Sequence, residues 1–308
     1  MWFKNLYLYR VHDAATWPAS FEEALSEQAA RPIGSQEARR IGWTAPAGRA
    51  GTALLHELQG HRLITAERQE RILPPAVVRE EVDERASEIE QREGRKLRRQ
   101  ERQELKEHIY EELLPQAFVK FQRIDVWWDT NRSLIAVNTS SRKRAEEALD
   151  LLRETLGSVK VTPLATQTLP MRAMTQWLEW PERRPAALLL GDHAVLTAPG
   201  ENGTINARHV DLDDDEIQGH RAAGRQVQRL AIEIESVMSF VLHDDLAIKS
   251  IRFDDILLDE ASETEDDGDA VIRLEADFLL MTRALGASID SLIAWMGGEA
   301  NLASEVAA

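Results

Sequence analysis

Residues 118–139, FVKFQRIDVWWDTNRSLIAVNT, contain the pattern from which the fold can be worked out. Two runs rich in aromatic and β-branched side chains flank a turn at residues 130–132, and this is the pattern of a β-hairpin. A strongly periodic helix follows over residues 142–156, and residues 159–164 return to a strand pattern. The order strand, strand, helix, strand predicts an α+β fold with a helical layer on one face of the sheet.

The segment before this hairpin has a different character. Apolar residues recur at helical spacing over residues 75–115, but a basic connection near residues 94–100 interrupts them. Two such helices bury little by themselves, so we expect them to project from the body as an arm. We therefore predict a central α+β domain over residues 1–74 and 116–164, the helical arm over residues 75–115, and a C-terminal α+β base domain over residues 165–308.

The C-terminal part alternates strand and helix patterns. Short strand patterns precede an expected helix over residues 213–234, whose acidic first turn suits the helix dipole. A hairpin pattern follows over residues 239–253, and an apolar face marks an expected closing helix over residues 276–296. Hairpins connected in this way predict antiparallel or mixed sheets.

Composition narrows the class of protein. Of the 308 residues, 43% are hydrophobic, with eight Trp and seven Phe, which is typical of a globular chain with ample core material. The absence of cysteine excludes disulfides, thiolate zinc sites and a cysteine nucleophile. No run of apolar residues has the length of a membrane span or a signal peptide, so we expect a soluble, cytoplasmic protein without a membrane partner.

Charge is distributed unevenly along the chain. The net charge is −16, and residues 201–308 carry 24 acidic against 8 basic side chains, so residues 1–200 are balanced. Within the balanced part, residues 91–102 (QREGRKLRRQER) have six basic and two acidic side chains. A basic patch on an acidic protein indicates a local surface that meets a polyanion. The alternative is an ordinary solvated helix whose charges pair with one another.

The chemistry of this patch favours a phosphate backbone. On a helix, Arg95, Arg98, Arg99 and Arg102 are spaced to share one face, and guanidinium groups bind phosphates well. The patch has no interleaved aromatic residues of the kind that stack single-stranded bases, and no base-reading module is recognisable. We therefore expect contact with duplex DNA without sequence readout.

Two further basic groups are candidates. One opens the helix at residues 142–144, where cations oppose the dipole and a bound phosphate would explain them, although ordinary solvated surface explains them as well. The other stands out because it lies in the acidic part of the chain, and two of its arginines are spaced to share the expected helix over residues 213–234. The complete set of predicted DNA contacts is Arg95, Lys96, Arg98, Arg99, Arg102, Arg142, Lys143, Arg144, Arg208, Arg221 and Arg225.

The search for catalytic residues is mostly negative. His56 and His61 resemble a zinc-protease pair, but their offset of five residues turns one ring away on a helix. Residues 47–52 (AGRAGT) lack the ending of a phosphate-binding loop. The acidic residues 211–216 lack the ligand spacing of a calcium loop and suit a helix start. We expect no cofactor and no metal, and a two-metal nuclease is the one enzyme class left to test.

Short motifs in a fixed order add a resemblance. They begin with WFKN at residues 2–5 and end with GGEA at residues 297–300, so they span essentially the whole chain. Each is weak alone, but the ordered set is similar to the RdgC family of bacterial recombination-associated nucleoid proteins. The remaining motifs are GSQ at 34–36, GW at 42–43, ILP at 72–74, LLP at 113–115, AF at 117–118, LLR at 151–153, LGS at 156–158, ADF at 276–278 and LMT at 280–282.

The resemblance implies a non-enzymatic protein that binds double-stranded DNA with little sequence preference. It implies curved, multi-domain subunits that form a ring-shaped homodimer with a positively lined hole, located on the nucleoid, and antagonism of the RecA recombinase through occupation of its DNA. For closure of the ring we consider Leu113, Leu114 and Phe118 at the arm as interface residues, with packing of the arm onto the body as the alternative, and the C-terminal helix as a second contact. Two other functions stay open: a metal-dependent nuclease using the acids near residues 211–216, and a scaffold whose basic arm binds an acidic protein.

Overall fold

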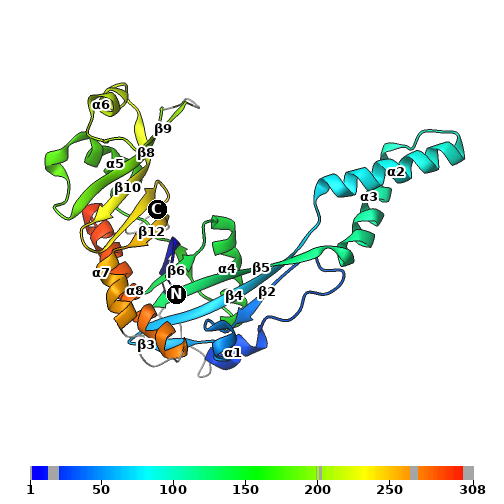
Figure 1. The fold of residues 1–308 in the computed structure, drawn as a ribbon, viewed down its shortest axis with the longest axis horizontal. Helices are drawn as coiled ribbons and strands as arrows, with labels where there is room; N and C mark the ends of the chain where they lie inside the picture. Colours follow the sequence, from blue (N-terminus) through cyan, green and yellow to red (C-terminus); the bar gives the residue numbers. More distant parts are fainter. Residues whose placement is uncertain (1, 13–20, 199, 201–202, 264–269, 301–308) are drawn as a thin grey trace, which may run out of the picture.

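One antiparallel sheet runs through the molecule (Figure 1). The structure is a computed structural model and describes residues 2–12, 21–198, 200, 203–263 and 270–300. Among these residues, twelve strands form the sheet in the order β2-β4-β5-β6-β1-β12-β11-β10-β8-β9, with β3 paired to β4 and β7 paired to β1. The strands are β1 (Asn5–Val11), β2 (Arg39–Thr44), β3 (His56–Leu58), β4 (His61–Ile72), β5 (Phe118–Asp129), β6 (Leu134–Asn138), β7 (Val161–Pro163), β8 (Leu188–Thr197), β9 (Thr204–Arg208), β10 (Gln226–Ile234), β11 (Met238–His243) and β12 (Ile248–Phe253).

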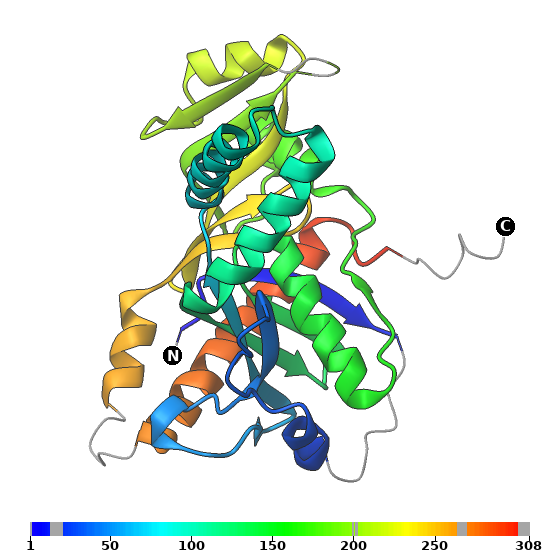
Figure 2. The ribbon, with the colours of Figure 1, turned by 90° about the vertical axis from the view of Figure 1, so that its right-hand side faces the viewer.

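Helices cover the two halves of this sheet unequally, and the α+β prediction is confirmed. The half containing β1 and β6 lies between α4 on one face and α8 on the other, as seen from the side of the arm in Figure 2. Within the described residues, α5 and α8 cover the half from β12 to β9 on one face only. The helices are α1 (Phe21–Glu27), α2 (Pro75–Glu93), α3 (Arg99–Leu113), α4 (Arg142–Leu156), α5 (Pro170–Glu179), α6 (Asp215–Ala222), α7 (Asp255–Glu263) and α8 (Ala270–Trp295), with single 3₁₀ turns at Gly48–Ala50, Leu114–Gln116 and Pro181–Arg183.

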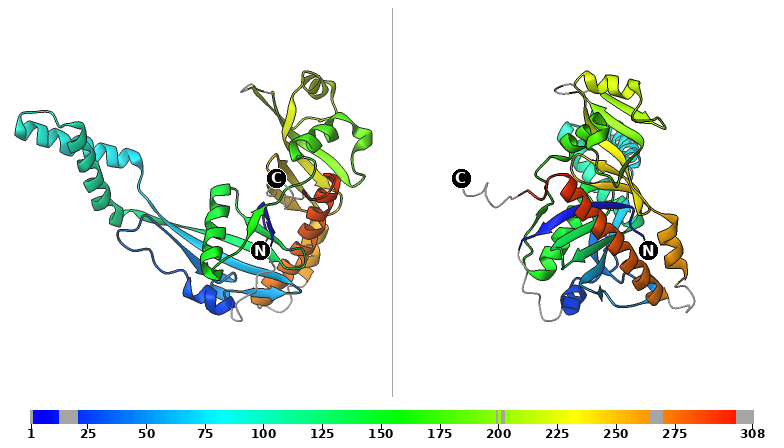
Figure 3. Two further views of the ribbon diagram at one scale, coloured as in Figure 1. Left: turned by 180° about the vertical axis from the view of Figure 1, so that it is seen from behind. Right: turned by 90° about the vertical axis from the view of Figure 1, so that its left-hand side faces the viewer.

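The subunit is curved, and the curve follows from how the two halves of the sheet meet. Strands β1 and β12 are joined by only two residue pairs, Asn5 with Lys249 and Leu6 with Ile248. The views in Figures 1 and 3 show a concave side that contains α4 and a convex side that carries α7 and α8. The arm of α2 and α3 forms one end of the curve, and β9 with α6 forms the other.

The arm consists of two helices, as the sequence predicts. Pro75 lies in the first turn of α2, where the missing N–H of proline costs nothing. The helix ends where Gly94 adopts a left-handed conformation with φ of 67°, which favours glycine. The two helices pack through a small core of Val78, Val82 and Ile109.

The expected helix over residues 213–234 is wrong in its second half. The chain forms α6 and then strand β10, with Gly224 at φ of 82° between them. The apolar residues Leu230, Ile232 and Ile234 alternate with outward residues, which is a strand period, and they pack into the core beneath α5 and α8. The sheet is continuous from β2 to β9, so the division of the chain into three domains stays a prediction.

The closing helix α8 is the main element of the larger core. By length and composition it is the one helix among the described residues that is apolar enough to cross a membrane, but 56% of its most apolar window is buried inside the protein. Phe278, Met281 and Leu285 are fully buried, and each such side chain contributes about 1.5–3 kcal/mol of hydrophobic stabilisation. The core that α8 fills explains its apolar composition.

This packing predicts a large difference between two substitutions on the same helix. Phe278→Ala leaves a cavity in the core and should lower the free energy of unfolding by about 3–5 kcal/mol. Ile272→Ala, at a position that is 51% exposed, should change it by less than about 0.5 kcal/mol. Urea unfolding followed by circular dichroism measures both values, and equal effects would contradict the role of α8 as a core helix.

Candidate nucleic-acid interface

The half-sheet from β12 to β9 has an open face on the concave side of the subunit. In these strands, alternate residues point toward α5 and α8, so the residues between them point to the open face. Strand β11 shows this directly, because Phe240 and Leu242 are in the core while Val241 and His243 are not. The side chains of Arg229 on β10 and Lys249 on β12 are placed on the open face by the same alternation.

A row of basic side chains crosses this face from strand to strand. Strand register pairs Arg208 with His193, Arg229 with His243, and Lys249 with Asn5 at the seam. We call Arg208, His193, Arg229, His243 and Lys249 the cationic row. Strands lie about 4.8 Å apart, so a row across five strands is about 19 Å long. All five residues line one shallow pocket with a volume of about 510 Å³.

The cations of this row have no acidic partner. Among the described residues, no carboxylate oxygen lies within 4.0 Å of the charged nitrogens of Arg208, Arg229 or Lys249. The nearby carboxylate of Asp192 is 2.8 Å from Nδ1 of His209. Asp192 lines the same pocket but is held by His209, so in the described part of the chain the carboxylate at this face does not pair with the row. Unpaired like charges repel one another, and a bound anion removes that repulsion.

The electrostatics of the row affect His243. Burial, followed by the neighbouring charges of Lys249 and Arg229, lowers the pKa of His243 to about 4, against a smaller opposite effect of Asp245. The imidazole is therefore neutral near pH 7. Backbone strain lies beside it, because Ser250 and His209 line the same pocket with φ of 54° and 56°. Residues other than glycine that adopt a positive φ are often found at functional sites.

The row continues into the start of α4. The Nζ of Lys249 donates a hydrogen bond to the carbonyl oxygen of Ser140 (3.2 Å) and lies 5.2 Å from the centre of the Tyr7 ring. Two residues later α4 begins with Arg142 and Lys143, both exposed, and the helix has no side-chain cap on its first N–H groups. Two of the three predicted cations of this group thus adjoin the row. Arg144 is half-buried, and its charge adds a small effect to that of Arg68, whose hydrogen bond is the main cause of the lowered pKa of Glu70.

The predicted arm cations are arranged differently from the expectation. The four arginines do not share a helix face, because α2 ends at Glu93 and α3 begins at Arg99. Acids neutralise three cations of the group: Arg95 pairs with Glu101 and Glu93 (both 2.8 Å), Lys96 with Glu90 (2.6 Å), and Arg102 with Asp83. Arg98 and Arg99 are exposed, and no ion pair involves either one within the described part of the chain.

The third predicted group is also divided. Arg208 belongs to the cationic row, but Arg221 and Arg225 do not share a helix because α6 ends at Ala222. Arg225 instead donates a hydrogen bond to the carbonyl oxygen of Gly203 (3.0 Å). Arg221 lies in α6, and its side chain is outside the described residues.

Sequence reasoning missed four members of the row: His193, Arg229, His243 and Lys249. Arg229 was hidden by the expectation of one long helix over residues 213–234. The alternation of apolar Leu230, Ile232 and Ile234 with other residues was the signal for a strand, and it places Arg229 on the face opposite the core. For the other three residues, strand register decided their position.

The candidate metal and catalytic residues do not form a site in the described part of the chain. No group of three or more His, Asp or Glu there is arranged to hold a metal ion. His56 and His61 lie on paired strands β3 and β4 joined by a tight turn, and the Trp127 indole N–H donates to Nδ1 of His61 (3.2 Å). Asp213 is held by Arg184 at 2.9 Å.

Comparison with known proteins agrees with the resemblance seen in the sequence. The sequence model of a family described as "Putative exonuclease, RdgC" matches residues 1–299. The chain belongs to the RdgC family. It is 38% identical over 305 residues to the recombination-associated protein RdgC of Tolumonas auensis, and 38% identical over 302 residues to that of Yersinia pestis. Each alignment covers 97% of this chain and 99% of the relative.

In this member of the RdgC family, the three residues considered for a subunit contact have different surroundings. Leu114 is only 4% exposed and Leu113 packs against the arm core, so both stabilise the base of the arm within one subunit. Phe118 is 85% exposed. Phe121 on the same strand is 60% exposed, and Ile72, which pairs with Phe118, is also exposed. Phe118 and Ile72 share one face of the β4–β5 ribbon, whereas Phe121, three residues along the strand, points to the opposite face. We call Ile72 and Phe118, which lie where β4 and β5 reach the arm, the apolar patch.

The displaced pKa of His243 predicts how stability depends on pH. Its folded-state pKa of about 4 lies below the value of ~6.5 in an unfolded chain, so the unfolded state binds the extra proton between these values. The free energy of unfolding should therefore be highest above about pH 6.5 and should fall as the pH is lowered toward about 4. His243→Gln should lose less stability than the wild type between about pH 7 and about pH 5, as measured by urea unfolding.

A second variant tests the cause of this shift. Lys249→Met removes one of the charges that lower the pKa of His243, so it should also reduce the loss of stability at low pH. An equal loss in the wild type and in His243→Gln would show that other groups control this pH range.

Proposed function

We propose that this member of the RdgC family binds double-stranded DNA without sequence preference, as a ring-shaped homodimer, and has no enzymatic activity. By occupying DNA it limits access of the RecA recombinase and so modulates recombination. The observation that carries the proposal is the cationic row, in which Arg208, Arg229 and Lys249 form no ion pair among the described residues and line one pocket. The name of the relatives, recombination-associated protein, is consistent with this role.

The row suits a duplex backbone better than single-stranded bases. A duplex carries about one charge per 1.7 Å of its axis, so a row about 19 Å long faces several phosphates in any register. Binding of this kind carries no sequence information. The aromatic ring next to the row is Tyr7, which is buried beneath Lys249 and so offers no surface for base stacking.

The shape of the subunit supports enclosure of the duplex. The strands β10 to β12 and the start of α4 border the concave side, and the net charge of −16 disfavours contact of DNA with the rest of the molecule. One curved subunit leaves the concavity open, and a second copy closes it. The apolar patch at the base of the arm suits such a contact, because a monomer gains nothing from exposing Ile72 and Phe118. We place the protein on the nucleoid in the cytoplasm, without a membrane partner or a cofactor.

The description of the family names one enzymatic alternative, an exonuclease. A metal-dependent nuclease needs acids that converge on a metal ion. In the described residues the candidate acids do not converge, and Asp213 is neutralised by Arg184. The DNA-binding assay therefore includes Mg²⁺, and its products are examined on a gel. Cleavage that disappears in Asp213→Asn and Asp215→Asn would establish the nuclease instead.

The central prediction concerns DNA affinity across a salt series. Arg229→Gln combined with Lys249→Gln should weaken binding to mixed-sequence duplexes at least about tenfold, equally for all sequences. It should also reduce the slope of log affinity against log salt by about 0.9 for each phosphate that the variant no longer neutralises. Fluorescence anisotropy with labelled duplexes measures both quantities.

Two further variants locate the DNA. Arg172→Gln removes an exposed cation from α5 on the convex side and should leave affinity unchanged. If the arm contacts DNA, the double variant Arg98→Glu with Arg99→Glu should weaken binding to all sequences. An unchanged affinity would show that the arm is not part of the DNA interface. Wild-type affinity in the Arg229 and Lys249 variant would contradict the assignment of the row.

The apolar patch predicts the oligomeric state. Phe118→Asp places a charge in the patch and should shift the protein from dimer toward monomer in sedimentation velocity at micromolar concentration. Leu169→Asp, at an apolar position that is 70% exposed at the start of α5, is the matched control and should remain dimeric. A monomeric wild type, or a dimeric Phe118→Asp variant, would contradict a contact through this patch.

A further inference from the structure

The pocket that contains the cationic row also gathers histidines. Of the eight histidines in the chain, His193, His209 and His243 line this one pocket. An imidazole is the side chain that ordinarily changes its charge between about pH 5 and pH 8, whereas arginine and lysine side chains stay charged throughout that range. The positive charge of the pocket therefore has a permanent part and a part that depends on pH.

An irregularity in β8 carries the first of these histidines to the pocket. The register between β8 and β10 shifts, so that residues 191–193 of β8 lie opposite Ala231 alone. Gly191 permits this close passage, because a Cβ atom there would lie 2.8 Å from Cβ of Ala231. Neighbouring residues of a regular strand point to opposite faces, but a bulge can turn both to one side. Asp192 and His193 both line the pocket.

A second irregularity lies just beyond β9. Arg208 and His209 are neighbours along the chain and also both line the pocket. His209 has a φ of 56°, which breaks the strand alternation after Arg208. Its Nδ1 donates a hydrogen bond to Oδ2 of Asp192 (2.8 Å), and the two side chains are 89% and 61% exposed. Two separate departures from regular strand geometry thus bring an imidazole and a carboxylate together beside the row.

The two histidines have different partners. Nε2 of His193 donates to Oδ1 of Asn206 (3.0 Å), and Nε of Arg208 donates to the same oxygen (3.3 Å). An amide holds both groups in place but supplies no negative charge. Protonation of His193 therefore adds a positive charge to the row, whereas protonation of His209 offsets the negative charge of Asp192.

We propose that His193 and His209 regulate DNA binding at the cationic row, so that the protein binds duplex DNA more tightly at about pH 6 than at about pH 8. This inference rests on the proposed duplex binding. At the higher pH both imidazoles are neutral, and Asp192 presents an unbalanced carboxylate to the phosphates. At the lower pH the pocket gains two positive charges, which phosphates attract.

The surroundings of the pair leave these two histidines as the groups that respond. The hydrogen bond from His209 lowers the pKa of Asp192, and the charges of His209 and His193 add to this effect against burial, so the carboxylate stays ionised. His243 stays neutral between about pH 6 and pH 8, because its pKa is about 4. The ionisable groups around the pair are Asp192 and His193 on β8, Arg208 on β9, Arg229 on β10, His243 on β11, Asp245 in the turn after β11, and Lys249 on β12.

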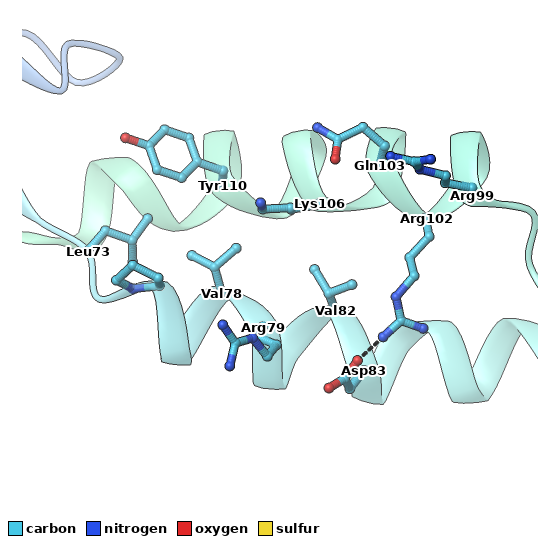
Figure 4. Close-up of a pocket in the computed structure, with 11 residues that line it drawn as sticks. Leu73, Val78, Arg79, Val82, Asp83, Arg99, Arg102, Gln103, Lys106 and Tyr110 are labelled. Carbon is cyan, nitrogen blue, oxygen red and sulfur yellow. Dashed lines mark hydrogen bonds and ion pairs between the residues drawn. The ribbon is translucent and has the colours of Figure 1, made fainter.

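The groove between the two arm helices provides an internal comparison (Figure 4). No histidine lines this groove in the described part of the chain, so its charge is constant between about pH 6 and pH 8. Contact of DNA with the groove therefore adds the same affinity at both pH values, and a dependence on pH reports the row. The basic residues that line the groove are Arg79, Arg99, Arg102 and Lys106.

The test measures duplex affinity by fluorescence anisotropy at fixed ionic strength from about pH 6 to about pH 8. The wild type should bind at least about tenfold more tightly at pH 6 than at pH 8, because each proton taken up on binding changes log affinity by up to about one per pH unit. The double variant His193→Gln with His209→Gln should match the wild type at pH 8 and lose the gain at pH 6. Damage to the fold would instead weaken binding at both pH values.

Two single variants make the assignment specific. Asp192→Asn keeps an oxygen acceptor for His209 but removes the charge, so it should strengthen binding more at pH 8 than at pH 6. His12→Gln is the control. His12 is exposed and hydrogen-bonded to Thr162 beyond the far end of β1, roughly 20 Å along that strand from Asn5 at the seam, and the variant should bind like the wild type throughout.

Three outcomes would overturn the proposal while leaving duplex binding intact. Equal wild-type affinity at both pH values would show that the histidines do not regulate the row. A pH dependence that persists in the double histidine variant would assign it to other groups. An equal gain from Asp192→Asn at both pH values would show that His209 does not control the carboxylate. Absence of duplex binding at every pH would instead contradict the proposed function itself, so the two failures are distinguishable.

Discussion

The packing of α8 across the seam between β1 and β12 is the constraint on which the rest of the structure depends. The seam itself has two residue pairs, too few to fix the angle between the half-sheets. Helix α8 passes over the convex side of both halves and buries its apolar face in one core with them. Ion pairs hold its C-terminal end, since Arg132 pairs with Asp290 on α8 and Arg10 pairs with Glu299 just beyond it. The curvature of the subunit is therefore set by hydrophobic burial on the convex side, with charged contacts at the end of the helix.

In the β12–β9 half of the sheet the core lies on one face, so the other face can carry charged side chains that bind a ligand. The open strand face is exposed to water, so it tolerates the cationic row, and its concave position directs those charges inward. Arg208, Arg229 and Lys249 form no ion pair among the described residues, which concentrates positive potential where the curve can enclose a polyanion. The arm separates two roles in the same way. Its paired charges connect the two helices, while Arg98 and Arg99 at the start of α3 form no ion pair among the described residues.

Much of the fold could be read from local patterns, and the errors have physical causes. The hairpin at residues 118–139, the helix α4 and the two arm helices follow from turn residues, periodicity and glycine positions, which act over a few residues. The region around Gly224 was misread because its acidic and basic residues fit a helix until the alternation of β10 begins. The predicted face of arm arginines failed for a related reason. Spacing alone assumes an unbroken helix, whereas Gly94 ends one helix and the intervening turn brings Arg95 onto Glu101.

By itself, the sequence determined the α+β class, the projecting helix pair, the segregation of acidic charge to residues 201–308 and the ordered motifs of the RdgC family. These are properties of composition and of neighbours along the chain. Only the tertiary structure decided which cations are unpaired and where they meet. Strand pairing places Lys249 beside Asn5, and α8 ends beside β1, contacts between residues more than 200 positions apart. Whether a lysine or arginine is neutralised or left free depends on such contacts, because ion pairs act over a few ångströms and the fold alone determines which residues come that close.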